Sequence, residues 1–155
     1  MKHKILSVTG HPDAQVLQLT NHYAERVNHY ASCVLVDNKS RKKISERDKL
    51  IASEGDWLLE NIVSADIVLL LDEKGKHITS PQLAQLLQNL QNSGTRTCIS
   101  IIGGAFGVDK RIKERANHTI TLSAFTLPHQ LARLIWVEQL YRAYTILHNE
   151  KYHHI

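Results

Sequence analysis

One continuous stretch of this 155-residue sequence reads LSAFTLPHQLARLIWVEQLYRAY, at residues 122–144. Small and apolar residues fill its first part, and Pro128 then predicts the first turn of a helix, where a proline sacrifices no intrahelical hydrogen bond. On a helical wheel of residues 130–147, apolar side chains point in nearly every direction, so this helix must be covered on more than one side. We expect another subunit to supply the second cover, and the preceding loop to wrap a small ligand. The first apolar face consists of Trp136, Val137, Leu140, Tyr144 and Leu147, and the second of Leu131, Ile135 and Ile146.

Short β-rich runs alternate with helical patterns along the chain, which predicts a single α/β domain over residues 1–155 on a mainly parallel sheet. The run DIVLLL at residues 66–71 is almost continuously apolar, as expected for a parallel strand covered on both faces. Residues 72–76 then predict a turn, and Ser45 is expected to cap a helix. The expected strands are residues 4–8, 33–37, 66–71, 97–102 and 119–122, and the expected helices are residues 13–30, 45–61, 80–92, 109–116 and 130–147.

Composition argues against several classes of protein. No apolar run approaches the roughly 20 residues needed to span a bilayer, so we expect no membrane partner. Cys33 and Cys98 both fall in expected strands, which indicates buried thiols in a reducing cytosol. The histidines show no spacing typical of a closed metal site, and we expect no metal. The sequence also lacks a nucleophile elbow, so hydrolysis has no support.

The net charge of +4 is unevenly distributed. Such clusters of lysine and arginine are typical of surfaces that bind the phosphate backbone of nucleic acids. A solvated loop and a solvated helix face explain either cluster equally well, and only the two together favour nucleic acid. The first cluster consists of Lys39, Arg41, Lys42, Lys43, Arg47 and Lys49, and the second of Lys110, Arg111, Lys113 and Arg115.

Three loops, at residues 71–75, 103–107 and 122–127, follow expected strands. In open α/β sheets, ligands bind beyond the carboxyl ends of the strands, so these loops are the candidate ligand site. The sequence GGAFG of the second loop permits close backbone approach to a ligand, although tight turns also use such glycines. It matches neither the dinucleotide nor the P-loop pattern, which argues against NAD and ATP. His129, at the expected helix start, is either an active-site group or a surface residue near the cap.

Several motifs in order resemble one family. They are LDEKGK at residues 71–76, IGGAFG at residues 102–107, LSAFTLPHQLAR at residues 122–133, EQLYRAY at residues 138–144, the tail YHH at residues 152–154, and the pair Glu54-Gly55. Together they are similar to the ribosomal RNA large subunit methyltransferase H family, of the SPOUT class, and the resemblance covers essentially the full length. Two departures lie at the edges of the pattern: Gly10 lacks the lysine that usually follows it, and the chain ends with an additional Ile155.

The resemblance implies a complete set of properties. The fold would be a SPOUT-type α/β knot, a parallel sheet with helices on both faces and a C-terminal trefoil knot. The protein would be a cytoplasmic homodimer that methylates N3 of a pseudouridine in helix 69 of 23S rRNA, on the assembled 70S ribosome, with S-adenosyl-L-methionine as cofactor. The implied cofactor-binding residues are Leu71, Gly103, Gly104, Leu122, Ser123, Ala124, Phe125, Thr126 and Leu127. The implied catalytic residues, which would hold the base or assist loss of its proton, are His129, Arg142, Tyr152 and His153.

Two other interpretations remain open from the sequence. A SPOUT methyltransferase acting on tRNA would share the cofactor pocket and differ in its substrate. A non-catalytic RNA-binding module would carry the basic clusters without affinity for adenosylmethionine. For Arg142, an ion pair at a subunit interface is as good an explanation as a catalytic role.

Overall fold

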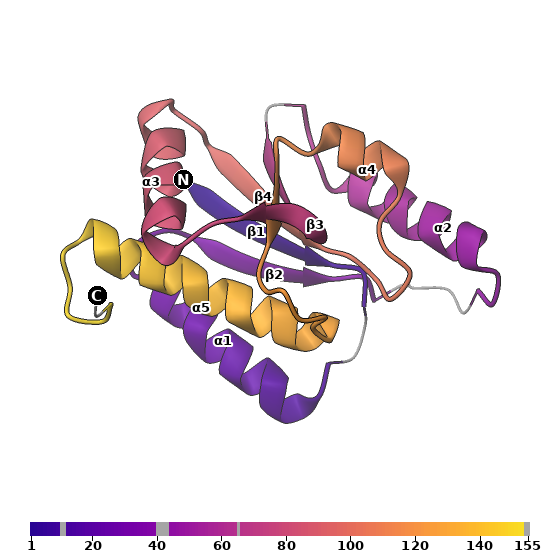
Figure 1. Cartoon of the computed structure of the whole chain (residues 1–155), viewed down its shortest axis with the longest axis horizontal. Helices are drawn as coiled ribbons and strands as arrows, with labels where there is room; N and C mark the ends of the chain where they lie inside the picture. Colours follow the sequence, from indigo (N-terminus) through magenta and orange to yellow (C-terminus); the bar gives the residue numbers. More distant parts are fainter. Residues whose placement is uncertain (10–11, 40–43, 65, 154–155) are drawn as a thin grey trace.

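The computed structural model describes residues 1–9, 12–39, 44–64 and 66–153. Five strands alternate with five helices along the chain, as the sequence predicts (Figure 1). The strands are β1 (Lys2–Ser7), β2 (Cys33–Asp37), β3 (Ile67–His77), β4 (Thr97–Ile102) and β5 (His118–Thr121). The helices are α1 (Ala14–Asn28), α2 (Arg47–Glu60), α3 (Ser80–Asn92), α4 (Lys110–Arg115) and α5 (His129–Leu147).

All five strands are parallel and lie in the order β2-β1-β4-β3-β5. The chain therefore adds β2 on one side of β1, and then builds β3, β4 and β5 on the other side. Since every strand runs in the same direction, all the loops that follow the strands lie at the same end of the sheet, at the carboxyl ends of the strands. The path of the chain through a knot stays a prediction.

Helices cover both faces of the sheet, because successive residues of each strand point to opposite sides. Leu69 and Leu71 of β3 pack in one core cluster with buried residues of α1, α3 and α5. Val68 and Leu70 pack in a second cluster with residues of α2 and α4. Figure 1 shows α1 and α5 side by side across one face, with α2 and α4 together on the other. The continuous apolar run in β3 thus serves two cores, as the sequence predicts.

Helix α5 is buried along the first of its two predicted apolar faces. Trp136, Val137 and Leu140 are almost fully buried. On the second face Leu131 remains 38% exposed, so part of that face has no cover within the chain. Pro128 is the N-cap of the helix rather than a residue of its first turn, with an extended ψ of 140°. Proline has no N–H, and at the N-cap, as in the first turn, this costs no intrahelical hydrogen bond.

A buried ion pair ties the start of α5 to the sheet. Nη1 of Arg133 lies 2.6 Å from Oδ1 of Asp37, at the carboxyl end of β2, and the Arg133 side chain is 4% exposed. Removing either partner would leave a buried charge without compensation, so this contact fixes the register of α5 on the sheet.

Two local predictions are wrong. Residues 72–76 do not form a turn, because β3 continues through them to His77 and pairs again with β5 after a register shift between Leu71 and Lys76. Ser45 is not the cap of α2, which begins at Arg47 with Glu46 as the N-cap. Other residues singled out from the sequence lie outside the described residues: Gly10, residues 41–43 of the first basic cluster, and the tail residues His154 and Ile155.

Candidate cofactor pocket

A cavity of about 910 Å³ lies beside the middle of β3 and beyond the carboxyl ends of β4 and β5. Its floor is formed by the last core residues of these strands, Leu71, Ile102 and Thr121. The loops that follow β4 and β5 and the first residues of α5 form its walls. This size suits a ligand as large as a nucleoside with an amino-acid side arm. The three segments that the sequence marks as a ligand site therefore meet at one cavity, although residues 71–75 belong to strand β3 and are not a loop.

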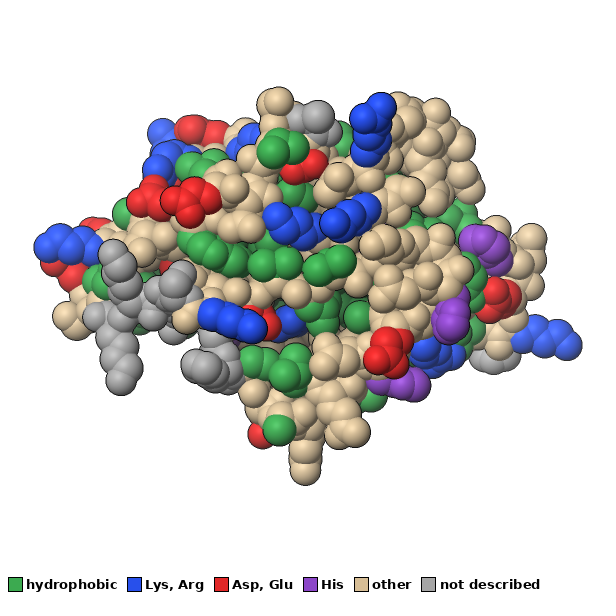
Figure 2. Space-filling model, turned by 180° about the vertical axis from the view of Figure 1, so that it is seen from behind, with side chains coloured by type: hydrophobic (Ala, Val, Ile, Leu, Met, Phe, Trp, Pro, Cys, Tyr) green, Lys and Arg blue, Asp and Glu red, His purple; other side chains and the backbone are tan. Residues whose placement is uncertain are grey.

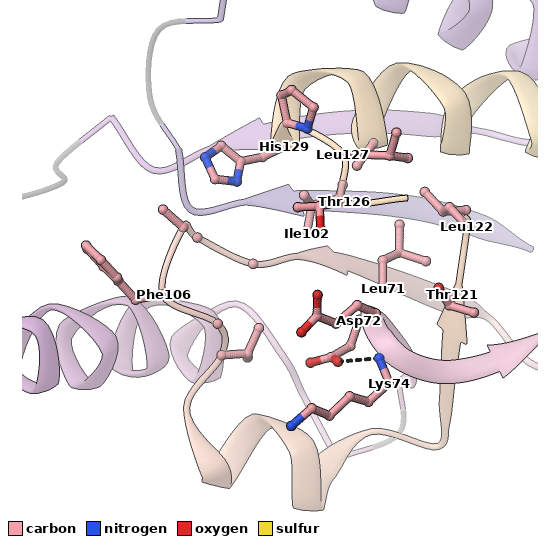
Figure 3. Close-up of a pocket in the computed structure, with 18 of the residues that line it drawn as sticks. Leu71, Asp72, Lys74, Ile102, Phe106, Thr121, Leu122, Thr126, Leu127 and His129 are labelled. Carbon is pink, nitrogen blue, oxygen red and sulfur yellow. Dashed lines mark hydrogen bonds between the residues drawn. The ribbon is translucent and has the colours of Figure 1, made fainter. Parts of the chain in front are cut away.

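Figure 3 shows how the cavity is divided between apolar and charged walls. Leu71 and Ile102 lie in the middle, with His129 on one side and Asp72 and Lys74 on the other. Oδ1 of Asp72 accepts a hydrogen bond from the Lys74 amide at 2.9 Å. The charged wall consists of Arg47, Asp72, Glu73, Lys74 and Lys113. The predicted ligand segment 71–75 includes Asp72, Glu73 and Lys74, whereas the sequence analysis did not place Arg47 and Lys113 at the site.

The glycine-rich loop after β4 is packed closely from behind. A Cβ on Gly103 would collide with Cγ2 of Val108, and one on Gly104 would lie 2.6 Å from Oε2 of Glu54. Glu54 is 6% exposed, so its buried carboxylate side chain forms part of the support of this loop. Gly107 has a φ of 91°, which other residues rarely adopt. Packing and backbone conformation therefore require glycine at these positions. Gly103, Gly104 and Gly107 have no side chains, so the cavity is lined there by their main chain.

The loop after β5 contributes most of the predicted cofactor-binding residues. Leu122, Ser123, Phe125, Thr126 and Leu127 all line the cavity. The exposed Ala124 does not, although it lies between two residues that do. Within the part of the chain that the structure describes, the backbone N–H groups of residues 124, 126 and 127 donate no hydrogen bond. These groups are thus available to a ligand.

His129 is the one candidate catalytic residue at this cavity. Arg142 lies 13 positions later on α5, and at 1.5 Å per residue this separates the two Cα atoms by about 20 Å. Arg142 instead forms an ion pair with Glu138 of the same helix, with Nη2 2.6 Å from Oε1. Tyr152 donates a hydrogen bond to the same oxygen at 3.0 Å. The four candidates therefore do not meet within one chain.

His153 lines a separate cavity of about 620 Å³ between α3 and α5. Its Nδ1 is buried and has no partner among the described residues, and the same is true of Nε1 of Trp136 in that cavity. The two cavities share Thr121 and Leu122, so the loop after β5 separates them.

Other predictions concern charge, metal and thiols. In the second basic cluster, Lys110, Arg111 and Lys113 pair with carboxylates, and Arg115 donates to backbone carbonyls. The described residues contain no group of side chains suited to a metal ion, and none of their helices is long and apolar enough to cross a membrane. Cys33 and Cys98 are buried, as predicted, and burial raises the pKa of both thiols to about 12.

Comparison with known proteins identifies the family. A family model described as "Predicted SPOUT methyltransferase" matches residues 1–153. The chain belongs to the SPOUT methyltransferase family. Proteins named ribosomal RNA large subunit methyltransferase H are similar to it over nearly their whole length, which confirms the resemblance seen in the motifs. The protein of Christiangramia forsetii is 38% identical over 94% of both chains, that of Flavobacterium johnsoniae 37% over 99% of both, and that of Nitratidesulfovibrio vulgaris 39% over 88% of both.

Membership of this family makes the protein a methyltransferase, and a methyltransferase needs a methyl donor. The parallel sheet with helices on both faces agrees with the predicted fold class. In this SPOUT methyltransferase the 910 Å³ cavity is the candidate site for the donor.

Proposed function

We propose that this methyltransferase transfers a methyl group from S-adenosyl-L-methionine to N3 of a pseudouridine in helix 69 of 23S rRNA, on the assembled 70S ribosome in the cytoplasm. The observation that carries the proposal is the cavity beside β3 and beyond the ends of β4 and β5. It lies in a chain that is similar over nearly its full length to relatives named ribosomal RNA large subunit methyltransferase H.

The residues of the cavity fit adenosylmethionine in size and chemistry. Leu71, Ile102 and Leu127 supply apolar surface for a flat adenine ring. Backbone N–H groups of the loop after β5 can donate to its ring nitrogens. The charged wall offers Asp72 and Glu73 to a cationic sulfonium or an α-amino group, and basic side chains to an α-carboxylate. When bound, the cofactor supplies an electrophilic methyl group on sulfur.

The transfer breaks one carbon–sulfur bond and forms one carbon–nitrogen bond, while N3 of the base loses a proton. The protein must therefore align N3 with the methyl group and provide a path for that proton. Alignment alone contributes much of the rate in such displacements. His129 lies at the start of α5 on the cavity wall, where an imidazole could hold the base or accept the proton.

A homodimer would bring the remaining candidates to the same place. The second apolar face of α5 retains exposed surface at Leu131, and two copies of this face can cover one another about a two-fold axis. If the two helices run antiparallel, the end of one lies beside the start of the other. The partner subunit's Arg142 and the partner subunit's Tyr152 would then approach the cavity lined by His129.

The surface offers a combination suited to RNA. On the face opposite to that of Figure 1, Figure 2 shows hydrophobic side chains in a band across the middle, with lysine and arginine side chains on either side of it. Basic side chains bind phosphates, and apolar surface accommodates unstacked bases. The single domain carries no additional RNA-binding module within its described residues, which favours a substrate whose shape is presented by the ribosome.

The test is methyl incorporation from labelled adenosylmethionine into 70S ribosomes, free subunits and bulk tRNA, prepared from a strain that lacks the protein. We expect label in 70S ribosomes alone. Label in tRNA would show that the substrate is tRNA and not the ribosome, and the assignments of fold and cofactor would stand. No label in any RNA, with no cofactor bound, would contradict the proposal and leave an RNA-binding module.

A further inference from the structure

The Glu138 carboxylate in the middle of α5 accepts hydrogen bonds from three different side chains. Its Oε1 accepts from Nε of Arg142 at 3.1 Å, from Nη2 of Arg142 at 2.6 Å and from the Tyr152 hydroxyl at 3.0 Å. Its Oε2 accepts from Nε2 of Gln139 at 2.7 Å. The side chains of Glu138 and Arg142 are only 17% and 26% exposed, so solvent competes weakly for these bonds.

The network continues from Glu138 to both sides. Oε1 of Gln139 accepts a hydrogen bond from the Ser80 hydroxyl at 2.7 Å, which connects the carboxylate to the start of α3. On the other side the Arg142 guanidinium lies over the Tyr152 ring, with Cζ 4.6 Å from the ring centroid. The Tyr152 ring also meets Tyr141 edge-on at 4.7 Å. A single carboxylate thus joins α3, α5 and the tail that follows α5.

The hydrogen bonds to Glu138 restrict the orientation of the Arg142 and Tyr152 side chains. An arginine held by two bonds to one oxygen cannot rotate freely, and a tyrosine hydroxyl that donates to that oxygen has its ring direction fixed. A terminal segment such as residues 148–153 is normally poorly ordered unless it is tied down. The Tyr152 hydroxyl bond is one such tie, and it leads to the same carboxylate that holds Arg142.

We propose that Glu138 is a positioning residue for methyl transfer, which sets the orientation of Arg142 and Tyr152 through one shared carboxylate oxygen. The inference rests on the proposed function, because it gives Arg142 and Tyr152 a part in handling the substrate base. It adds that neither acts alone: loss of the carboxylate releases both together. Glu138 itself lines neither cavity, so we expect its effect to fall on the rate and not on cofactor binding.

The protonation state of Tyr152 agrees with a positioning role. Burial, followed by hydrogen bonds with Tyr23 and Glu138, raises the pKa of the Tyr152 phenol above its ordinary value. The hydroxyl therefore stays protonated at neutral pH and donates to the carboxylate. A protonated Tyr152 hydroxyl favours a role in orienting its neighbours.

The test compares three variants with the wild-type protein in methyl transfer to 70S ribosomes. Glu138→Gln keeps the volume of the side chain and removes its charge, and we expect kcat to fall by on the order of 10²-fold, as a displaced reacting group does. The dissociation constant for adenosylmethionine should stay within about twofold of the wild-type value, a change well below the tenfold that 1.4 kcal/mol produces. Tyr152→Phe should lower kcat as well, and adding Glu138→Gln to it should cost less than Glu138→Gln costs alone.

Glu150→Gln is the matched control. Glu150 also accepts a tyrosine hydroxyl, that of Tyr30 at 2.7 Å, and it lies in the same tail, but it has no bond to Arg142. We expect this variant to retain wild-type kcat. A spectroscopic readout separates positioning from general destabilisation. The ionisation of Tyr152, obtained as the difference in absorbance between each protein and its Tyr152→Phe counterpart, should shift to lower pH in Glu138→Gln, because the carboxylate that opposes ionisation is gone.

Four results would contradict the inference: wild-type kcat in Glu138→Gln, equal losses in Glu138→Gln and Glu150→Gln, a loss confined to cofactor affinity, or fully additive losses in the double variant. If the wild-type protein itself methylates no RNA, the proposed function fails and the inference fails with it. If the wild-type protein methylates 70S ribosomes and Glu138→Gln has the same kcat, the proposed function stands and the inference alone is wrong.

Discussion

Gly103 has no room for a side chain, because a Cβ there would collide with Cγ2 of Val108. We expect Gly103→Ala to push the loop after β4 into the cavity and to weaken the binding of adenosylmethionine. We expect the displaced loop to lose about 1 kcal/mol of binding free energy, which corresponds to roughly a fivefold rise in the dissociation constant. Isothermal titration calorimetry with adenosylmethionine measures this dissociation constant directly.

The matched control for Gly103 is the double variant Gly103→Ala/Val108→Ala, in which the second substitution removes the atom that the new Cβ meets. Part of the affinity should return. If Gly103→Ala alone binds the cofactor as the wild type does, the loop does not contact the ligand and the assignment of Gly103 to the cofactor site is wrong.

His3 is fully buried in β1, with Nε2 2.8 Å from the Tyr144 hydroxyl. Burial, with a smaller contribution from the charged N-terminus, lowers its pKa from 6.5 to about 4. The unfolded chain therefore binds a proton near pH 6.5 that the folded protein takes up only near pH 4. The contribution of the neutral imidazole to the free energy of unfolding is therefore complete above pH 6.5. It falls by about 3 kcal/mol as the pH drops to 4.

Urea unfolding at pH 7 and pH 4 measures this effect as a difference between the wild type and His3→Gln. The wild type should lose more of its free energy of unfolding than the variant over this interval, because the variant has no imidazole to protonate. Equal losses in the two proteins would contradict the assignment of a buried neutral imidazole.

Single residues of the site were predictable where a strand end and a motif coincide. Leu71, Gly104 and Leu127 were placed at one edge of the sheet from sequence, and all three line the cavity. The support behind the glycine loop was not predictable, because Glu54 lies on α2 and meets Gly104 only through tertiary packing. The Glu54-Gly55 pair in the family-like motif was the one sequence signal that pointed to it.

At the scale of elements, α5 carries the main prediction. Leu131 and Ile146 lie near opposite ends of its second apolar face, and an antiparallel pair of α5 helices would bring them together. We expect the double variant Leu131→Glu/Ile146→Glu to be monomeric in size-exclusion chromatography with light scattering. It should bind adenosylmethionine and lose methyl transfer, because the partner subunit's Tyr152 would no longer reach the cavity.

Val63→Glu is the control for this interface. Val63 is a large apolar residue, 62% exposed, in the connection between α2 and β3 and away from α5. The variant should remain dimeric and active. A dimeric Leu131→Glu/Ile146→Glu protein, or a fully active monomer, would contradict the proposed role of α5.

The length of β3 shows where local sequence reasoning fails. The residues Asp72-Glu73-Lys74-Gly75 are typical of a turn, yet the strand continues through them. Lys76 and His77 pair with Ile120 and Thr121 of β5, more than 40 positions away. Gly75 packs against the backbone of Ile120, where a Cβ would lie 2.5 Å from its carbonyl carbon. The glycine serves this close approach of two strands, which no local pattern reveals.

At the scale of the whole molecule, the alternating pattern predicted the α/β class and all ten elements, because each strand and helix buries a face of recognisable period. The order β2-β1-β4-β3-β5 was not predictable, since strand order depends on contacts between distant segments. The same limit applies to the site. The family resemblance joined His129 with Arg142 and Tyr152 in one group. Within a chain, the fold places His129 at the start of α5, Arg142 in its last two turns and Tyr152 in the segment after it.

The most direct measurement of the central claim is the position of the new methyl group. Ribosomes from a strain that lacks the protein would be incubated with it and adenosylmethionine, and the 23S rRNA analysed by reverse transcription and nucleoside mass spectrometry. A methyl on N3 blocks base pairing, so we predict a new stop at one pseudouridine in helix 69 and a methylpseudouridine in the digest, with 70S ribosomes only. A methylated nucleoside at any other position, or in free subunits or tRNA, would contradict the claim.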